Sequence, residues 1–304
     1  MQVYLVAIEE GFLYGLLAIG IYISLRILDI PDLTTEGSFG FGSAVAAVVA
    51  SHGYGILSFV AAVLAGVAAG VVTALLQTKI KVHPVLAGII TMSGLYSINL
   101  MVRGSSNLNF NDNSVFTKLF NALGVSGIDK KITGLVLSAA VCIVILILII
   151  VFFKTHLGLC IRATGDNPDM VRASSVNVNF SLIFGLALAN GLIALSGAFL
   201  SHYMGLSDQS FSNGTLIYGL AAVIIGEAIF GKRSVTLGLI SAVVGSVIYK
   251  IIVAFVIDVS LFGKNSENLM KLACALIVTV TLLIPEVKAR LQKNKAAKEA
   301  KRNA

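Results

Sequence analysis

The feature that most constrains this chain is a series of apolar runs long enough to cross a lipid bilayer. A membrane-spanning helix needs about 17 to 25 mostly apolar residues. Eight runs of roughly that length occur, at residues 10–28, 56–77, 84–102, 133–153, 179–201, 214–231, 235–257 and 268–285. The bilayer core offers no water to unpaired backbone groups, so such runs fold as helices. We therefore expect an all-α fold, a polytopic transmembrane helical bundle.

The composition agrees with this fold class and excludes most others. Of the 304 residues, 57% are hydrophobic and only 12% are charged, whereas an ordinary soluble domain carries about 25% charged residues. The three cysteines form no CxxC pair and have no metal-ligand spacing with histidine. Disordered chains, disulfide scaffolds and nearly all soluble enzyme classes are thereby excluded, and we expect no metal site.

A ninth, shorter span is expected at residues 37–51, which are rich in Gly and Ala and follow the polar stretch 29–36. Irregular backbone at membrane depth is tolerated only where protein or a watery cavity satisfies it. We expect about nine spans, one of them short or broken. The polar residues at and near this break either border a translocation path or form a structural kink; they are Asp32, Thr34, Thr35, Glu36 and Ser38.

Two further polar residues, Asn99 and Asn190, lie in otherwise apolar runs. Polar groups inside the membrane are costly and usually face protein or a cavity. For each of them hydrogen bonding between helices is the favoured interpretation, and both are also candidates for the translocation path. Two surface expectations complete this set: His202 is expected at the exterior, and Glu227 is expected to pair with Lys232 or Arg233.

Charge at the C-terminal end predicts the orientation. Residues 286–304 carry seven Lys and Arg against two Glu, and basic flanks of membrane helices lie in the cytoplasm. With nine spans the N-terminus is then outside, which places 15 Lys and Arg inside and seven outside. Without the tail the two sides are nearly equal, so the tail and the span number decide the orientation.

The same reasoning gives the domain organisation. A transmembrane domain is expected over residues 1–285, with an external loop at 103–132 and a cytoplasmic loop at 154–178, followed by the basic cytoplasmic tail 286–304. The first span has no basic stretch before it and is expected to be retained rather than cleaved as a signal peptide. The tail accounts for most of the positive charge, so we expect the lipid bilayer as a partner and no nucleic acid.

The cytoplasmic loop 154–178 contains a helix-start signal. Asn167 can cap a helix, Pro168 suits its first position, and Asp169 is favourable toward the helix dipole. A short helix is therefore predicted over about residues 168–175.

A near match to a phosphate-binding loop occurs at residues 226–233, whose sequence is GEAIFGKR. The motif requires Ser or Thr at the last position, to hold Mg²⁺, and a preceding strand. Neither condition is met, so we expect no nucleotide site and no enzymatic activity on this chain.

Three segments resemble a known family. They are the loop sequence GDNPDMVRASSVNV at residues 165–178, the Gly- and Asn-bearing run after it, and the stretch DLTTEGS at residues 32–38. The chain resembles the permease subunits of bacterial ATP-binding-cassette importers of the branched-chain amino acid and ribose class, and most closely the branch paired with tryptophan/tyrosine-type binding lipoproteins. The resemblance covers roughly residues 10–285. Two departures are Val171, where the family usually has Ala, and Ser175, where it usually has Gly.

The resemblance implies a function. In this family the short cytoplasmic helix docks onto a separate ATPase, and the matching residues here are Gly165, Asp166, Asn167, Pro168, Asp169, Met170, Val171 and Arg172. It further implies transport of a small solute, an amino acid or similar, which an extracellular binding lipoprotein delivers to the permease. The implied assembly is a homodimer of permeases in the bacterial cell membrane with cytoplasmic ATPase subunits, which hold the ATP and Mg²⁺.

The sequence is less consistent with two other functions. A stand-alone ion-coupled secondary transporter usually places ionisable residues near the bilayer midplane, and the apolar runs contain almost none there. An intramembrane enzyme would need a nucleophile with its base, or metal ligands, and no such spacing occurs.

Overall fold

The computed structural model describes residues 2–122, 124, 128–174, 176–231, 234–258 and 279. Apart from Thr279, the expected span 268–285 and the tail 286–304 lie outside the described residues. The helices are α1 (Gln2–Tyr22), the π-helical turn η1 (Ile23–Ile27), α2 (Thr35–Ser51), α3 (Gly55–Thr78), α4 (Pro84–Arg103), the 3-10 turn η2 (Asn111–Asn113), α5 (Val115–Ala122), α6 (Ile128–Phe152), α7 (His156–Asp166), α8 (Pro168–Ala173), α9 (Val178–Met204), the 3-10 turn η3 (Gln209–Ser212), α10 (Thr215–Phe230) and α11 (Val235–Asp258). Two short strands are β1 (Asn107–Asn109) and β2 (Leu206–Asp208).

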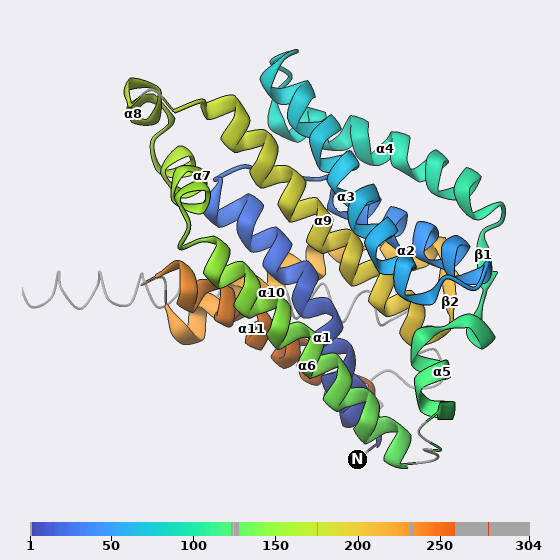
Figure 1. Ribbon diagram of the computed structural model, residues 1–304. Coiled ribbons are helices and arrows are strands. Elements are labelled where there is room, and N and C mark those ends of the chain that lie inside the picture. Colours follow the sequence, from blue (N-terminus) through green and yellow to red (C-terminus); the bar gives the residue numbers. More distant parts are fainter. Residues whose placement is uncertain are drawn as a thin grey trace, which may run out of the picture.

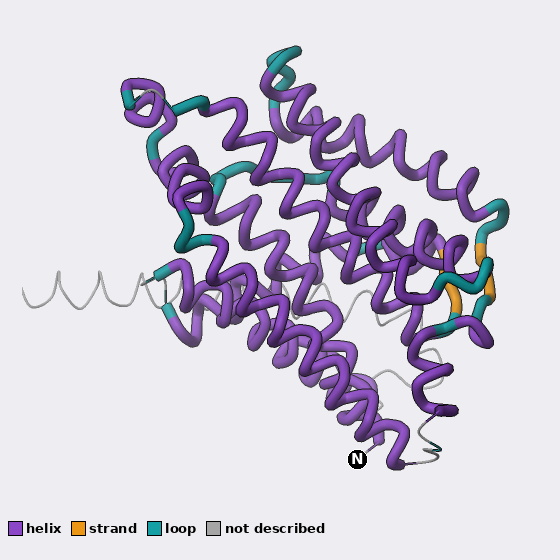
Figure 2. Tube along the Cα trace, viewed as in Figure 1, coloured by secondary structure: helices purple, strands orange, loops and turns teal. Residues whose placement is uncertain are grey.

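The helices pack side by side into a bundle around α1 and α9 (Figures 1 and 2). Helix α1 contacts α6, α9 and α11, while α9 contacts α2 and α3 on its other side. Seven segments are long and apolar enough to cross a membrane: Val3–Ile27, Gly55–Thr78, Pro84–Arg103, Lys131–Phe152, Val178–Met204, Gln209–Phe230 and Val235–Val256. The predicted helical membrane bundle is confirmed, whereas nine spans remain a prediction.

The predicted break before the short span is present. Helix α1 ends in the π-helical turn η1, and the chain then runs without helix until α2 begins at Thr35. Asp29 has φ 55°, and the Thr34 backbone N–H donates to Asp32 Oδ1 over 2.8 Å. Short polar side chains that satisfy nearby backbone groups favour such turns over helix. Helix α2 has 17 residues, about 25 Å of rise, and is largely buried.

Small residues allow the closest helix contacts. A Cβ on Gly66 would collide with Ala194 Cβ and with the carbonyl oxygen of Asn190, both on α9. One turn later, a Cβ on Gly70 would lie 2.5 Å from the carbonyl oxygen of Leu186. The four-residue spacing of these glycines therefore brings α3 onto α9 within the chain.

The two ends of the bundle differ. At one end β1 pairs with β2 in an antiparallel register that places Leu108 opposite Ser207, and α5 lies beside them (Figure 1). At the other end, η1, α7 and the start of α11 surround a common pocket, with α8 farther out (Figure 1). Residues 25–29, 159–166 and Val235 thus meet at one end of the bundle. Spans that cross the membrane in alternating directions would place these three connections on the same side.

Candidate functional site

A buried polar network lies where α2 begins. Asn190 Nδ2 donates to Asp32 Oδ2 over 2.7 Å, and Ser38 Oγ donates to Asn190 Oδ1 over 2.6 Å. Thr35 Oγ1 donates to the backbone oxygen of Asp32. Asn190 is the thirteenth residue of the 27-residue helix α9, so this network lies near the middle of the bundle.

One member of the network was not predicted. Thr73 on α3 is fully buried, and its Oγ1 lies 2.9 Å from Thr34 Oγ1. Threonine is common in membrane helices because its hydroxyl can bond to its own backbone, as Thr73 does to Ala69. No pattern in the sequence therefore indicates that Thr73 faces Thr34.

The candidate path residues fall into two groups. Five form the buried network: Asp32, Thr34, Thr35, Ser38 and Asn190. The other two line a separate cleft of about 360 Å³ between α2, α4 and the segment before α10. The residues around this cleft, which we call the α2–α4 cleft, are Glu36, Gly37, Met92, Ser93, Tyr96, Asn99, Gln209, Ser212 and Asn213.

Two polar residues of the α2–α4 cleft, Glu36 and Asn99, hold backbone groups of neighbouring segments. Glu36 Oε1 accepts the backbone N–H of Gly214, 2.9 Å away, at the start of α10. Asn99 is fully buried and donates through Nδ2 to the Gly37 oxygen, 3.3 Å away. Within the described part of the chain, Asn99 Oδ1 has no hydrogen-bond partner.

The loop 154–178 contains the predicted helix and one more. Asn167 caps α8 by accepting the Met170 backbone N–H over 3.0 Å, with Pro168 at the first position. The helix ends at Ala173 rather than near residue 175, and Ser175 lies outside the described residues. Helix α7 was not predicted, because its mixed composition includes two glycines.

The side chains of α8 divide into an outer and an inner set. Met170 is 61% exposed, and Arg172 donates to Asp169 within the helix over 2.9 Å. Val171 is buried, so the substitution of Val for the family's usual Ala faces the protein interior. Asp166, Asn167 and Pro168 are exposed.

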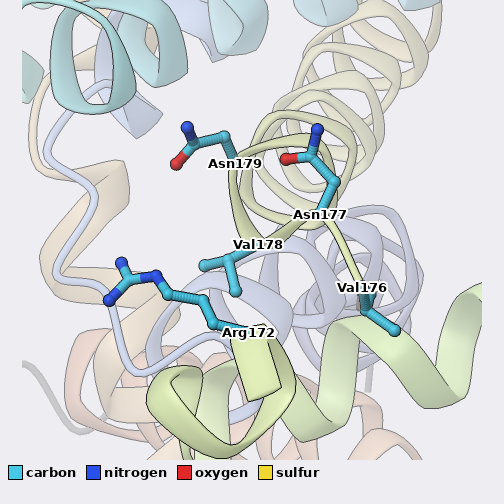
Figure 3. Close-up of a pocket in the computed structure, with 5 residues that line it drawn as sticks. All are labelled: Arg172, Val176, Asn177, Val178 and Asn179. Atoms are coloured by element: carbon cyan, nitrogen blue, oxygen red, sulfur yellow. The ribbon is translucent and has the colours of Figure 1, made fainter. Parts of the chain in front are cut away.

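Between α8 and the start of α9 lies a pocket of about 370 Å³. Figure 3 shows Arg172 and the amides of Asn177 and Asn179 around it. A guanidinium and two amides are suited to bind a carboxylate.

Helix α7 rests directly on the turn that ends α1. A Cβ on Gly165 would collide with the carbonyl oxygen of Ile27 and would lie 2.9 Å from Leu28 Cα. Only glycine permits this approach of α7 to the backbone of η1. The loop that carries α8 is thus packed against the segment that leads to Asp32.

Of the two surface expectations, the one for His202 is wrong and the one for Glu227 stays a prediction. His202 is fully buried rather than at the surface: its Nε2 lies 2.7 Å from Ser58 Oγ, and its Nδ1 accepts the Val115 backbone N–H over 3.2 Å. Glu227 forms an ion pair with Arg26 at 2.6 Å. Lys232 and Arg233, its expected partners, lie outside the described residues.

Two ionisable residues inside membrane-length helices pair with each other, which the sequence did not indicate. Lys250 Nζ on α11 lies 2.7 Å from Glu10 Oε2 on α1 and 4.3 Å from the ring centroid of Tyr14. Charges in membrane helices normally pair or face a cavity. Among the residues that the structure describes, no group of three His, Cys, Asp or Glu side chains could hold a metal ion.

These features define a multi-pass helical membrane protein whose polar residues gather at a mid-bundle break, in a cleft and in a capped loop helix. Residues 5–284 match the family described as the permease component of the branched-chain amino acid transport system, and the chain belongs to this family of ATP-binding-cassette importer permeases. It is a multi-pass protein of the bacterial cell membrane.

Several relatives match over most of their length. A tyrosine transport system permease protein of Clostridioides difficile is 33% identical over 94% of this chain and 92% of its own. The ribose import permease protein RbsC of Escherichia coli K12 is 25% identical over 91% of this chain and 83% of its own. A probable branched-chain amino acid transport permease protein, LivH of Methanocaldococcus jannaschii, is 26% identical over 91% of this chain and 88% of its own. No solved structure matches.

Proposed function

We propose that this chain is the membrane subunit of an ATP-driven importer that moves a small solute, an amino acid or similar, from an extracellular binding lipoprotein into the cell. It works as a homodimer and is driven by two cytoplasmic ATPase subunits, which carry the ATP and Mg²⁺. The N-terminus and the loop 103–132 are external, and the loop 154–178 and the tail 286–304 are cytoplasmic, with nine spans in a permease domain over residues 1–285.

The observation that carries the proposal is the exposed, capped helix α8. It projects from one end of the bundle and offers a flexible apolar side chain, Met170, beside the paired charges of Asp169 and Arg172. An apolar anchor with polar neighbours is typical of a protein contact. Residues Gly165 to Arg172 are therefore assigned to the ATPase contact.

A route from this contact to the interior supports the assignment. Gly165 holds α7 against the backbone of Ile27. Five residues after Ile27 the chain reaches Asp32, whose carboxylate accepts a hydrogen bond from Asn190 near the middle of the bundle. A shift of α7 and α8 can thus move the start of α2. In the proposed cycle the permease alternates between two conformations, and closure of the ATPases on ATP favours one of them through this contact.

The decisive experiment changes the outer face of α8. A Met170→Asp, Arg172→Glu double variant places acidic groups beside Asp169, and it should lose copurification of the ATPase and ATP-driven solute uptake in vesicles. Expression should remain near that of the parent, because neither side chain is buried. The control is Asp112→Arg, a charge reversal on an exposed residue at the other end of the bundle. Full ATPase binding and uptake by the double variant would contradict the coupling role.

ATP hydrolysis gives a second measurement. The purified chain alone should hydrolyse no ATP, because residues 226–233 lack the hydroxyl that a phosphate-binding loop needs for Mg²⁺. Turnover by the isolated chain that is abolished by Lys232→Ala would refute this. Uptake driven by an ion gradient without any ATPase would instead identify a secondary transporter.

A further inference from the structure

We propose that the pocket between η1, α7 and the start of α11, which we call the η1–α7 pocket, binds the headgroup of a zwitterionic phospholipid, phosphatidylethanolamine. The pocket has a volume of about 570 Å³ and is lined by side chains from residues 25–29 and 159–166 and by Val235. This volume lies within the range of small-molecule sites, about 300–1,000 Å³. The inference goes beyond the proposed function, because neither the solute nor the ATPase takes part in it.

The η1–α7 pocket lies at the level where membrane helices end. Two membrane-length segments, Val3–Ile27 and Val235–Val256, each reach the pocket with a terminal turn. The ends of such segments lie at the depth of the lipid headgroups. Beside the pocket, α7 exposes Leu157 and Leu159. A helix that exposes leucines next to charged groups at this depth is suited to contact lipid, so a membrane lipid can reach the pocket directly.

Four charged side chains line the pocket: Arg26, Asp29, Arg162 and Asp166. Arg26 is already neutralised by Glu227, which lies 2.6 Å away. The other three are exposed, and within the described part of the chain no hydrogen bond or ion pair engages them. Opposite charges that surround one pocket without pairing can both be satisfied by a ligand that carries both charges.

The order of side chains along α7 matches the order of groups in a phospholipid. Leu159, Arg162 and Asp166 are spaced by three and four residues, so they share one face of the helix. All three line the pocket. In phosphatidylethanolamine the acyl chains, the phosphate and the ammonium follow one another in the same order, and two carbons separate the phosphate from the ammonium. A phosphate on Arg162 therefore brings the ammonium toward Asp166, about 6 Å farther along the helix.

The charge balance favours this headgroup over others. Among the described residues that line the pocket, Arg162 is the cation left free, and it stands against the two carboxylates of Asp29 and Asp166. The phosphate of phosphatidylglycerol could bind Arg162 but would leave both carboxylates without a cation. Phosphatidylcholine carries a positive charge, but its quaternary nitrogen has no N–H to donate. A primary ammonium offers three donors with its charge, as the lysine side chain does, and can bond to both carboxylates.

The test measures lipid binding to the purified full-length permease without its ATPase. Delipidated protein is given equimolar palmitoyl-oleoyl phosphatidylethanolamine and palmitoyl-oleoyl phosphatidylglycerol, and the bound lipids are counted by native mass spectrometry. Phosphatidylethanolamine adducts should exceed phosphatidylglycerol adducts on the order of tenfold, because this headgroup forms charge-assisted hydrogen bonds with both signs of charge. Palmitoyl-oleoyl phosphatidylcholine, tested in the same way, should bind as weakly as phosphatidylglycerol.

Variants locate the binding in the η1–α7 pocket. Arg162→Gln should lower phosphatidylethanolamine binding on the order of fivefold, because the phosphate loses its cation. The double variant Asp29→Asn, Asp166→Asn should remove the preference over phosphatidylglycerol. Asparagine is chosen because it tolerates the left-handed backbone of Asp29. The control is Lys154→Gln, which removes an exposed cation of the same loop that does not line the pocket, and it should bind as the parent does.

A soluble headgroup distinguishes a lipid from a free metabolite. Glycerophosphoethanolamine, which has the same headgroup without acyl chains, should not displace the bound lipid even in excess. Its displacement of the lipid, equal binding of the three lipids, or parental binding by Arg162→Gln would each overturn the proposal. The measurement needs neither uptake nor an ATPase, so its failure would leave the proposed importer function untouched.

Discussion

Asn190 is the residue on which the buried contacts at the start of α2 converge. Its amide donates to Asp32 Oδ2 and to the Leu186 backbone oxygen, and its own oxygen accepts from Ser38. Aspartate at this depth is costly unless its oxygens are bonded. One amide therefore satisfies a carboxylate, a hydroxyl and a helix backbone together, and this favours the structural kink over an open path at Asp32.

Replacement of Asn190 by Ala should reduce stability. It leaves a carboxylate oxygen and a hydroxyl without partners, and each such group costs about 1–3 kcal/mol. We expect the apparent Tm in detergent to fall by several degrees, together with the amount of folded protein in the membrane. The control is Asn179→Ala, an exposed position on the same helix. Equal Tm values for the two variants would show that the network does not hold α2 in place.

His202, at the β1–β2 end, is a residue whose surroundings the sequence does not predict. A histidine near the end of an apolar run reads as external, yet this ring lies between Phe59 and Phe110 and joins α3 to the start of α5. Its burial depends on α5 folding back over the bundle, a non-local contact that has no pattern in the sequence.

His202→Ala should release α5. The Val115 amide loses its acceptor and Ser58 loses its ring partner, so hydrogen exchange over residues 110–120 should increase. Hydrogen–deuterium exchange in detergent measures this directly. The control is His52→Ala, an exposed histidine that follows α2. Unchanged exchange in His202→Ala would mean that the hydrophobic contacts of Phe116 and Phe120 alone hold α5.

At the scale of elements, the sequence predicted helices far better than it predicted their partners. The run 56–77 became α3 (Gly55–Thr78), and 214–231 became α10 (Thr215–Phe230), because the length of an apolar run is set by the membrane itself. Which side chain contacts Asp32 depends on the rotation of each helix about its own axis. The length of an apolar run does not determine that rotation. Helix α7 was missed because it is held by packing of its glycines rather than by periodicity.

The contact of α7 with η1 yields an element-scale prediction. In Gly165→Ala the added methyl group would overlap the Ile27 carbonyl, so α7 must move away from α1. We expect loss of uptake and a lower Tm. Gly94→Ala on α4 is the matched control, because a Cβ there meets nothing within 4 Å and alanine favours helix. Normal uptake by Gly165→Ala would indicate that α7 can separate from α1 without consequence.

At the scale of the molecule, the strand pair and the pocket near α7 give the bundle two distinct ends. The Asn107–Asn109 strand lies in the loop predicted to be external, and it pairs with Leu206–Asp208 from a later connection. Residues 25–29 and 159–166 meet at the opposite end. Both sets of contacts are expected when successive spans cross the membrane in opposite directions. The side of the membrane on which each end lies is predicted from the basic tail alone.

Orientation is testable with single cysteines in a background without Cys142, Cys160 and Cys274. Asp112→Cys, exposed at the β1–β2 end, should react with a membrane-impermeant maleimide in intact cells. Asp169→Cys, exposed on α8, should react only after the membrane is permeabilised. The expectation follows because the basic tail holds the last span with its C-terminal end in the cytoplasm, and α8 lies at the end of the bundle opposite the β1–β2 pair. The reverse labelling pattern would place α8 outside the cell, where no cytoplasmic ATPase could reach it, and the coupling role of residues 165–172 would have to be abandoned.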